Sequence, residues 1–257
     1  MENFQLKEFA EFIRTLAAKS GEVIQPYFTR AGLAVETKED RTIVTQADRE
    51  AETAMRELIR KRYPRHGILG EEFGPENASA EFVWTLDPID GTISFALGCP
   101  LFGTLISLLH GGKPILGAIH NPVLGQLCIG DNTETTFNGR AVKLRDTRHL
   151  SEAMLLTTDV ASIAKHQNKE GFEKLLGQTH LFRTWGDCYG YLLVACGGAD
   201  IMLDAIMNPW DILPLVPIIQ GAGGVISTWS GGDAARGDSC VAANKVLHPQ
   251  VLEILNS

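Results

Sequence analysis

Residues 84–92 read Trp84-Thr85-Leu86-Asp87-Pro88-Ile89-Asp90-Gly91-Thr92, an apolar run that ends in two carboxylates and is followed at once by Gly-Thr. Close anionic carboxylates at the end of a buried strand repel each other, so they need hydrogen bonds, a shared proton or cations. Oxygen ligands suit Mg²⁺, Mn²⁺ or Ca²⁺, whereas the Cys and His clusters typical of zinc sites are missing from the sequence. The stretch therefore predicts a site for divalent cations.

The backbone of this stretch also favours a phosphate site. Pro88 fixes its own φ and drives Asp87 toward extended backbone, so the strand end is rigid. Asp90-Gly91-Thr92 can open the helix or turn that follows, and N–H groups there would face a phosphate that Gly91 allows to come close. The alternative is a turn carboxylate and a helix N-cap, but the strand, the paired acids and Gly-Thr together favour function.

A second acidic pair lies earlier in the chain, where Gly70-Glu71-Glu72 follows the apolar Ile68-Leu69. Alone, this pattern is also typical of a solvated turn. Beside Asp87 and Asp90 it supplies a further carboxylate for a two-metal site, in which the cations lie about 3.5–4 Å apart. Of the pair, Glu71 is the expected ligand.

Composition and charge limit the possible partners. Hydrophobic residues make up 44% and charged residues 21% of the 257 residues, as in a globular protein with a sizeable core. The formal net charge of −8 argues against nucleic acid, since phosphate-backbone binding needs clustered Lys and Arg. No uninterrupted apolar stretch is long enough to span a membrane, so no membrane partner is expected.

The cysteines indicate a compartment. The five cysteines are scattered and never in C-x-x-C spacing, so neither a disulfide framework nor a zinc site is expected. The N-terminus lacks a basic region followed by an apolar one, so no signal peptide is expected. We therefore predict a reducing, cytoplasmic location.

Periodicity in the first half predicts helices followed by a sheet. Apolar residues recur at helical spacing over about residues 4–29, and again from a capping box at 45–48 until Tyr63-Pro64. Short apolar runs then indicate strands, with a hairpin turn at 111–113 that makes the sheet antiparallel in part. The expected strands cover residues 82–86, 104–109, 115–120 and 126–129.

A polar connection at residues 140–151 leads into a second half, in which strands and helices alternate as in α/β layers. We expect two halves that share one catalytic unit. Residues 1–145 form an α+β half and residues 146–257 form an α/β half. The expected strands of the second half cover 153–157 and 199–203, and its helices cover 165–176, 189–196 and 209–221.

Two further acids have a purely structural alternative. Asp48 in Thr45-Gln46-Ala47-Asp48 can complete a capping box. Asp211 in Asn208-Pro209-Trp210-Asp211 can do the same, since Asn is a good N-cap and Pro suits the first helical position. Spacing alone leaves both roles open.

Taken together and in this order, Gly70-Glu71-Glu72, Asp87-Pro88-Ile89-Asp90-Gly91-Thr92 and Trp210-Asp211 closely resemble the inositol monophosphatase superfamily of metal-dependent phosphatases. The likeness covers nearly the whole chain and includes the Thr-x-x-Asp helix start at 45–48, the turn Asn121-Pro122 and the glycine-rich helix end at 221–224. The resemblance implies a mixed α/β (α+β) fold layered as an αβαβα sandwich, and a homodimer. It also implies that residues 1–145 carry most metal ligands, and that residues 146–257 carry the specificity residues and one ligand.

The resemblance also implies a set of ligands. Glu71, Asp87 and the Ile89 carbonyl would hold one Mg²⁺, and Asp87, Asp90 and Asp211 a second. A third, weaker Mg²⁺ would share Glu71. The cofactor would thus be two or three Mg²⁺ ions, and the partner a small phosphorylated substrate.

The family's chemistry implies three catalytic residues: Glu71, Thr92 and Asp48. Thr92 would position the water nucleophile with Asp48 behind it, and Asp90, Gly91 and Thr92 would present backbone amides to the phosphate. The reaction would be in-line displacement by water without a phosphoenzyme, with metals neutralising the phosphate oxygens. Thr42 stands where the family motif usually has Asp, which trims the local negative charge and leaves the proposed ligands intact.

The segment from Arg183 to Tyr191 stands where inositol-specific members have a Gly-Thr-Ala-like polyol contact. Here Trp185-Gly186-Asp187-Cys188-Tyr189-Gly190-Tyr191 brings an acid and aromatics, and Asp204 replaces a longer Glu. Two acids facing a substrate suggest a cationic leaving group. The string resembles the histidinol-phosphate phosphatase branch. The expected substrate-binding residues are Asp90, Gly91, Thr92, Arg183, Gly186, Asp187, Cys188, Asp204 and Asp211.

Several alternatives stay open at this point. Asp187 could cap the helix that starts near Tyr189, Trp185 and Tyr191 could be core residues, and Asp204 could be an ordinary strand-end acid. The enzyme could be an inositol-1-monophosphatase or a broad sugar phosphatase; a nucleotide bisphosphatase fits less well. A protein of another class, a non-catalytic Mg²⁺ and phosphate sensor or scaffold, would bind these ligands without turnover.

Overall fold

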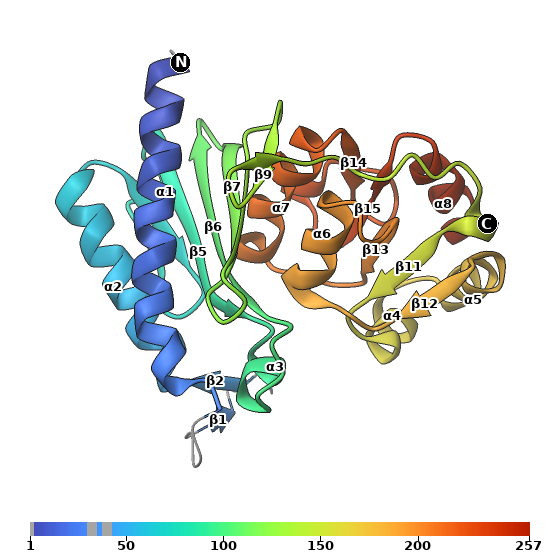
Figure 1. Ribbon diagram of the computed structural model, residues 1–257, viewed down its shortest axis with the longest axis horizontal. Helices are drawn as coiled ribbons and strands as arrows, with labels where there is room; N and C mark the ends of the chain where they lie inside the picture. The colour runs from blue at the N-terminus through green and yellow to red at the C-terminus, as the bar shows by residue number, and fades with distance from the viewer. Residues whose placement is uncertain (1–2, 30–34, 38–42) are drawn as a thin grey trace.

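The computed structural model describes residues 3–29, 35–37 and 43–257. Two sheets with helices on both sides of each stack side by side along the long axis of the molecule (Figure 1). Thr42, at which the sequence departs from the family motif, lies outside the described residues.

The first sheet has eight strands among the described residues, in the order β10-β9-β8-β7-β6-β5-β3-β4. Its pairs are antiparallel except for β3 and β5, which run parallel and therefore end at the same edge. The strands are β3 (Gly67–Gly70), β4 (Gly74–Glu76), β5 (Phe82–Asp90), β6 (Gly103–His110), β7 (Lys113–Asn121), β8 (Gln126–Gly130), β9 (Thr135–Phe137) and β10 (Arg140–Ala141).

Helices α1 (Asn3–Ile24) and α2 (Gln46–Arg62) cover the outer face of this sheet. Their apolar stripes, which include Phe9, Ile13 and Met55, pack against buried strand residues such as Trp84 and form one core. The predicted helix over 4–29 ends at Ile24, and a 3-10 turn (Gln25–Tyr27) follows because Pro26 has no N–H for a helical hydrogen bond. A short pair of strands, β1 (Val35–Thr37) and β2 (Ile43–Thr45), precedes α2.

The second sheet has five strands among the described residues, in the order β12-β11-β13-β15-β14. Apolar residues of α4, α5 and α8 cover its outer face, among them Ile163, Phe172 and Val251. Its strands are β11 (Met154–Thr157), β12 (Leu181–Arg183), β13 (Ile201–Asp204), β14 (Gly224–Ser227) and β15 (Cys240–Asn244), and its outer helices are α4 (Val160–His166), α5 (Lys169–Gln178) and α8 (Leu247–Leu255).

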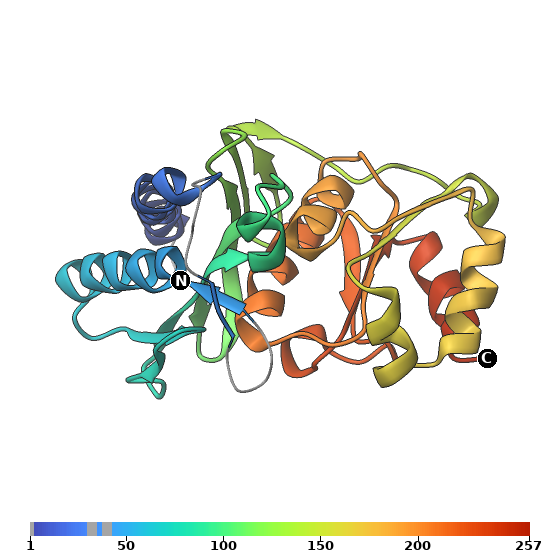
Figure 2. The same cartoon turned by 90° about the horizontal axis from the view of Figure 1, so that it is seen from below.

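Helices α6 (Asp187–Ala195) and α7 (Pro209–Gly221) lie between the two sheets (Figure 2). Both are apolar nearly all round, as expected for helices buried on two sides. One core joins Leu105 of β6, Tyr191 of α6, Leu215 of α7 and Met202 of β13. The predicted αβαβα sandwich is confirmed.

The elements predicted from periodicity are largely confirmed. The four strands predicted in the first half correspond to β5, β6, β7 and β8, and the Gly111-Gly112 turn joins β6 to β7. Helices α2 and α7 lie where the pattern placed them. One prediction is wrong: the single helix over 165–176 is two helices, because Asn168 takes an extended backbone and caps the second one.

The predicted division at residue 145 falls in the connection between β10 and β11, where the chain passes from one sheet to the other. Whether the two halves act as separate domains stays a prediction. Within the described part of the chain, none of the helices has the length and apolar character that a membrane span requires.

Candidate active site

The paired acids lie on strand β5 at a break in its regular pairing. Asp87 pairs with Leu105 and Asp90 with Gly103, and the register shifts between them. In a regular strand, residues three apart point to opposite faces, so this irregularity is what lets both carboxylates face one side. Pro88 is the local reason, since it has no N–H to donate to the ladder.

Hydrogen bonds fix this irregular stretch from both sides. The Asp87 carboxylate accepts from the Ile89 N–H at 3.0 Å. The Pro88 carbonyl accepts from the Thr104 hydroxyl at 2.8 Å, and Ser20 of α1 lies 2.9 Å behind that hydroxyl. Because Thr104 donates to a carbonyl, Ser20 must be the donor to Thr104.

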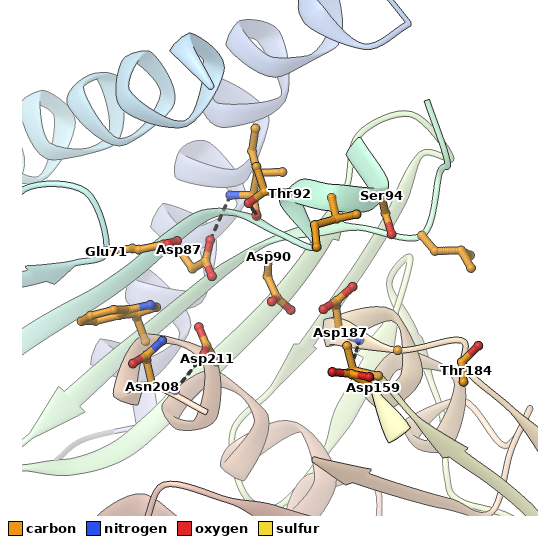
Figure 3. A pocket seen from close by; sticks show the side chains of 17 residues that line it. Glu71, Asp87, Asp90, Thr92, Ser94, Asp159, Thr184, Asp187, Asn208 and Asp211 are labelled. Atoms are coloured by element: carbon orange, nitrogen blue, oxygen red, sulfur yellow. Dashed lines mark hydrogen bonds between the residues drawn. The ribbon is translucent and has the colours of Figure 1, made fainter. Parts of the chain in front are cut away.

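Asp211 completes an acidic cluster from the other half of the chain. It lies in the first turn of α7, and its carboxylate accepts from the Asn208 N–H at 2.8 Å, so the expected capping contact is present. One carboxylate oxygen from each of Asp87, Asp90 and Asp211 lies within 4.8 Å of the others. Figure 3 shows these three carboxylates pointing into one space. The capping role and the ligand role are therefore compatible.

Burial makes these acids resist ionisation without a cation. It raises the pKa of Asp87 well above its usual range, and Glu71 and Asp90 nearby add to the effect. It likewise raises the pKa of Asp90, with Asp211 next in importance, and that of Asp211 to about 7. Such a cluster must hold protons or bind metal ions.

The cluster lies in a cavity of about 640 Å³ at the junction of the two halves (Figure 3). Among the described residues, its lining holds several carboxylates and no Lys, Arg or His. Such a cavity repels a phosphate unless cations lie between the acids and the anion. Hard oxygen donors this close together are the donor set that Mg²⁺ requires, so the residues fit the implied metal. The acidic lining residues are Glu71, Asp87, Asp90, Asp159, Asp187 and Asp211.

Glu71 reaches the cavity from the end of β3. Its N–H donates to the Leu86 carbonyl at 3.1 Å, which extends the parallel pairing of β3 with β5 and places both strand ends at one edge. The Ile89 carbonyl accepts from the Thr92 hydroxyl at 3.0 Å. The ligand roles of Glu71 and Ile89 stay predictions that this geometry allows.

Asp48 is buried and is not among the residues that line the cavity. Its carboxylate accepts from the Thr45 N–H at 2.8 Å and from the Thr45 hydroxyl at 2.6 Å, and burial raises its pKa to about 7. In the described part of the chain, no hydrogen bond joins Asp48 to Thr92. Asp48 thus completes the capping box with Thr45, as the structural alternative predicts. Its catalytic role stays a prediction.

Gly91 follows Asp90 of the acidic cluster and lies close to Asp187 of the second half of the chain. Its φ of 90° is a left-handed conformation that suits glycine, and it caps the short helix α3 (Thr92–Ala96). A Cβ there would lie 3.0 Å from the Asp187 carboxylate and 3.1 Å from the Leu101 carbonyl, so a side chain would crowd the cavity.

Asp187 faces the acidic cluster from the first turn of α6. The N-cap of this helix is Gly186, so the alternative in which Asp187 caps the helix is wrong. The Asp187 N–H donates to the Thr158 hydroxyl at 2.8 Å, which leaves its carboxylate directed into the cavity (Figure 3). Burial, with Asp90 second, raises the pKa of Asp187 to about 8.

Asp204 ends β13 and lines a smaller cavity of about 150 Å³, which shares Asp90, Asp187 and Asp211 with the larger one. Its carboxylate accepts from the Thr158 N–H at 3.2 Å, and burial raises its pKa to about 7. Asp204 is a strand-end acid, and it also faces the site.

Two expected substrate contacts are not supported by the geometry. Arg183 is exposed, donates to the Phe182 carbonyl at 2.6 Å and lies outside the described cavity lining. The Cys188 side chain is fully buried, and its N–H donates to the Asp90 carboxylate at 2.5 Å. Cys188 therefore contacts the acidic cluster through its backbone and orients the Asp90 carboxylate. Of the two aromatics, Tyr191 is core and Trp185 is exposed.

Part of the cavity wall consists of residues that the sequence did not predict as site residues. Thr158 and Asp159 follow β11, which runs parallel to β13, so their position beside Asp204 follows from the rule that parallel strands end at one edge. Polar residues after a predicted strand at 153–157 were the available signal. The other lining residues not anticipated are Ile93, Ser94, Leu101, Thr184, Asn208 and Trp210.

The layered fold encloses a buried cluster of carboxylates that suits metal ions, which is the arrangement expected of a metal-dependent hydrolase of phosphate monoesters. Residues 5–257 match the model of the inositol monophosphatase family, and the chain belongs to that family.

Two relatives and one solved structure support this family assignment. The chain is 40% identical to the bifunctional phosphatase IMPL2, chloroplastic, of Arabidopsis thaliana, covering 98% of this chain and 76% of that protein. It is 37% identical to the histidinol-phosphatase of Chlorobaculum parvum, covering 90% of each. The structure of an inositol monophosphatase from Zymomonas mobilis matches with a TM-score of 0.88 and 32% identity over 100% of both chains.

Proposed function

We propose that this chain is a Mg²⁺-dependent phosphomonoesterase that hydrolyses L-histidinol phosphate to L-histidinol and phosphate, a step of histidine synthesis. The observation that supports this substrate is an acidic wall: Asp187 and Asp204 line one small cavity together with Asp90 and Asp211 of the acidic cluster. An ammonium or imidazolium group gains charge–charge attraction from such carboxylates, whereas a neutral polyol gains only hydrogen bonds.

The proposed reaction divides the work among the lining residues. Asp87, Asp90 and Asp211 hold the metal ions, with Glu71 and the Ile89 carbonyl as further ligands. When bound, these ions supply positive charge to the phosphate oxygens and the departing alkoxide, and they acidify a water molecule. Thr92 would position that water with Asp48 behind it, and Glu71 would act beside them as the third catalytic residue. The amides of Gly91 and Thr92 receive phosphate oxygens at the N-terminus of α3.

The leaving group would lie between the cluster and the second half of the chain. Asp187 contributes a carboxylate from α6 and Asp204 one from β13. Thr158 links the two residues, because its hydroxyl accepts from the Asp187 backbone N–H and its own N–H donates to the Asp204 carboxylate. A cationic substrate would favour the ionised form of both acids, since burial alone raises the pKa of each. Histidinol carries two basic groups, which matches a wall with more than one acid.

The comparisons support this choice without excluding another. The relative from Chlorobaculum parvum is named a histidinol-phosphatase, and the Zymomonas mobilis structure is of an inositol monophosphatase. The second candidate is therefore an inositol-1-monophosphatase or a broad sugar phosphatase on the same scaffold. The lack of Lys and Arg in the described cavity lining disfavours substrates with a second phosphate.

A phosphate-release panel tests the proposal. The substrates are histidinol phosphate, inositol-1-phosphate, fructose-1,6-bisphosphate and an adenosine bisphosphate, each with and without Mg²⁺. We expect histidinol phosphate to be hydrolysed best, and only with Mg²⁺. Faster release from inositol-1-phosphate would transfer the assignment to the second candidate. Binding of Mg²⁺ and histidinol phosphate without turnover of any ester would favour the sensor or scaffold.

The Asp187→Asn variant tests the acidic wall. We expect kcat/KM for histidinol phosphate to fall at least about 10-fold, the effect of losing roughly 1.4 kcal/mol of interaction with the cation. Hydrolysis of a phosphomonoester with an uncharged alcohol as leaving group should change little, since Asn keeps the volume of Asp. Equal losses on both substrates would remove the role of Asp187 as a counter-ion.

Two properties complete the proposal. The cysteines Cys99, Cys128, Cys188, Cys196 and Cys240 are all free thiols, which supports a reducing, cytoplasmic location. The homodimer implied by the family is proposed for this chain as well, and sedimentation of the purified protein measures it directly.

A further inference from the structure

The turn that carries Glu71 is held from below by a buried ion pair on helix α2. Residues 71–73 connect β3 to β4, and only the Glu71 N–H continues the ladder with β5. The next two N–H groups point at the helix, where they need an acceptor. Glu52 supplies it.

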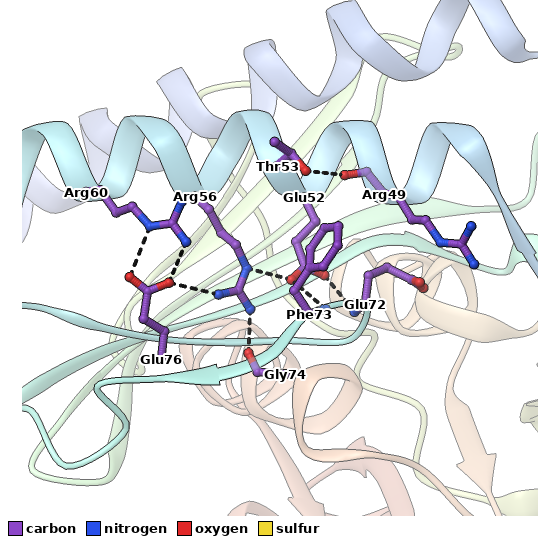
Figure 4. Close-up of polar contacts among 9 residues, drawn as sticks. All are labelled: Arg49, Glu52, Thr53, Arg56, Arg60, Glu72, Phe73, Gly74 and Glu76. Atoms are coloured by element: carbon purple, nitrogen blue, oxygen red, sulfur yellow. Dashed lines mark hydrogen bonds and ion pairs between the residues drawn. The ribbon is translucent and has the colours of Figure 1, made fainter.

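Glu52 is a fully buried carboxylate that accepts from both amides. One of its oxygens accepts from the Glu72 N–H at 2.8 Å, and the other accepts from the Phe73 N–H at 3.3 Å and from Arg56 Nε at 2.7 Å. The side chains of Glu52 and Arg56 are 0% and 4% exposed. Figure 4 shows both reaching from α2 to the turn.

Arg56 holds the far end of the same turn. Its guanidinium donates to the Gly74 carbonyl and, at 3.3 Å, to the Glu76 carboxylate (Figure 4). The guanidinium carbon lies over the Phe73 ring, 5.9 Å from the ring centroid. The pair therefore contacts the backbone on both sides of the turn.

The glycine before Glu71 is needed for this contact. A Cβ at Gly70 would collide with the Glu52 carboxylate and would lie 2.8 Å from Arg56 Nη2. Its backbone is that of a strand, so close approach of Glu52, and not a turn conformation, explains glycine here. The Gly-Glu-Glu motif and the buried pair are thus parts of one arrangement.

Helix α2 consequently supports the site along one face. Asp48 and Glu52 are one helical turn apart, and both side chains are buried. Asp48 closes the N-terminus of the helix, and Glu52 fixes the turn from which the Glu71 carboxylate extends toward Asp87 (Figure 3). Removing a buried carboxylate from two amides and an arginine would let that turn move.

We infer that Glu52 and Arg56 are positioning residues that set the geometry of Glu71 and thereby the affinity of the site for its metal ions. This inference rests on the proposed metal site. Partners that orient a metal ligand typically alter metal affinity or activity about 10- to 100-fold when they are removed. Neither residue lines the described cavity, so both act through Glu71.

The test compares Glu52→Gln with a matched control, Asp200→Asn. Asp200 is also a buried carboxylate that accepts from an arginine, a hydroxyl and a backbone N–H, namely those of Arg145, Thr147 and Met154. It lies just before β13, at the opposite end of that strand from Asp204. Both variants should lower the melting temperature of the metal-free protein.

Of these two variants, only Glu52→Gln should weaken Mg²⁺ binding. We expect the Mg²⁺ dissociation constant, taken from the Mg²⁺-dependent rise in melting temperature and from calorimetry, to increase about 10-fold, with kcat largely restored at saturating Mg²⁺. Gly70→Ala, which displaces the Glu52 carboxylate, should act in the same direction. Arg56→Lys, a milder change that keeps the charge, should do so less strongly and serves if Glu52→Gln does not fold.

The outcomes separate the two levels of the proposal. A wild-type protein whose stability and activity ignore Mg²⁺ would overturn the proposed function itself. A wild-type protein that binds Mg²⁺, together with Glu52 and Arg56 variants of unchanged Mg²⁺ affinity, would leave the function standing and overturn the positioning role. An equal loss of Mg²⁺ affinity in Asp200→Asn would also overturn the positioning role.

Discussion

Asp90 contributes a carboxylate to the acidic cluster and accepts the Cys188 N–H from the other half of the chain. One side chain thus links β5 to α6 at the site. The sequence predicts that Asp87 and Asp90 are functional, but their common direction depends on the break in β5. Pro88 is the sequence signal for that break, whereas the contact with Cys188 depends on packing between segments nearly a hundred residues apart.

Asp90→Asn tests the cluster at the scale of a residue. Asn keeps the volume and an oxygen for the Cys188 N–H, but it removes the negative charge that a metal ion needs. We expect phosphate release to fall by more than about 100-fold, beyond the loss typical of residues that only support a ligand. The melting temperature of the metal-free protein should change by only a few degrees, roughly the effect of 1 kcal/mol. Gross unfolding would instead make Asp90 a structural residue.

Helix α7 carries Asp211 to the site, and its placement depends on direct backbone contact with the first sheet. Gly117 on β7 and Gly130 on β8 face this helix, and a Cβ on either would collide with backbone near Pro214 or Pro217. The Ile218 carbonyl accepts from the Thr135 hydroxyl at 2.6 Å, which ties the helix to β9. The apolar character and bounds of α7 were predictable, but its partners were not.

Gly117→Ala tests this packing at the scale of an element. The added methyl group must push α7 away from β7, so we expect the free energy of unfolding in urea to fall by about 1–3 kcal/mol. Mg²⁺ affinity should also fall, because α7 positions Asp211. Gly177→Ala is the control: a Cβ there meets nothing within 4 Å, so stability should stay equal or rise by up to about 1 kcal/mol. Similar losses in both variants would refute the close packing.

The break between α4 and α5 shows where periodicity fails for an element. Asp159 and Asn168 each cap a short helix, through bonds to Ala161 N–H at 2.9 Å and Gly171 N–H at 3.1 Å. The helix predicted over 165–176 begins inside α4 and ends inside α5, so the prediction passes over the boundary between them, where residues 165–171 contain no apolar side chain to set a periodicity. The N-cap residues were the signal, and giving them more weight would have separated the helices.

At the scale of the whole molecule, the site exists only where the two sheets meet. Glu71, Asp87 and Asp90 come from the first half, and Asp187, Asp204 and Asp211 from the second. The resemblance to the family predicts that both halves contribute acids to one site, whereas local sequence patterns do not. The order β12-β11-β13-β15-β14 pairs segments far apart in sequence, and the strand Cys240–Asn244 has too little local signal to be found alone.

The acidic site predicts a pH dependence of stability in the metal-free protein. Burial raises the pKa of Asp187 to about 8 and that of Asp204 to about 7, from an ordinary 3.8. An acid with a raised pKa in the folded state stabilises the fold fully below its unfolded pKa, and this contribution is lost as pH rises through the folded value. We expect the melting temperature without Mg²⁺ to fall between about pH 5 and about pH 8.

Mg²⁺ should reverse this trend, because metal binding displaces protons and is stronger when the ligands are ionised. The rise in melting temperature caused by Mg²⁺ should therefore be larger at about pH 8 than at about pH 6. Asp187→Asn should flatten the pH dependence of the metal-free protein. An identical slope in this variant would show that other groups cause the trend.

The most direct measurement is an anomalous difference map from crystals soaked in Mn²⁺, which takes the same oxygen ligands as Mg²⁺. The structure predicts a strong peak among the carboxylates of Asp87, Asp90 and Asp211, and a second peak beside Glu71 and Asp87. Crystals of the Asp90→Asn variant should lose the first peak. A map of the wild-type protein without any peak at this cluster would contradict the metal-dependent account.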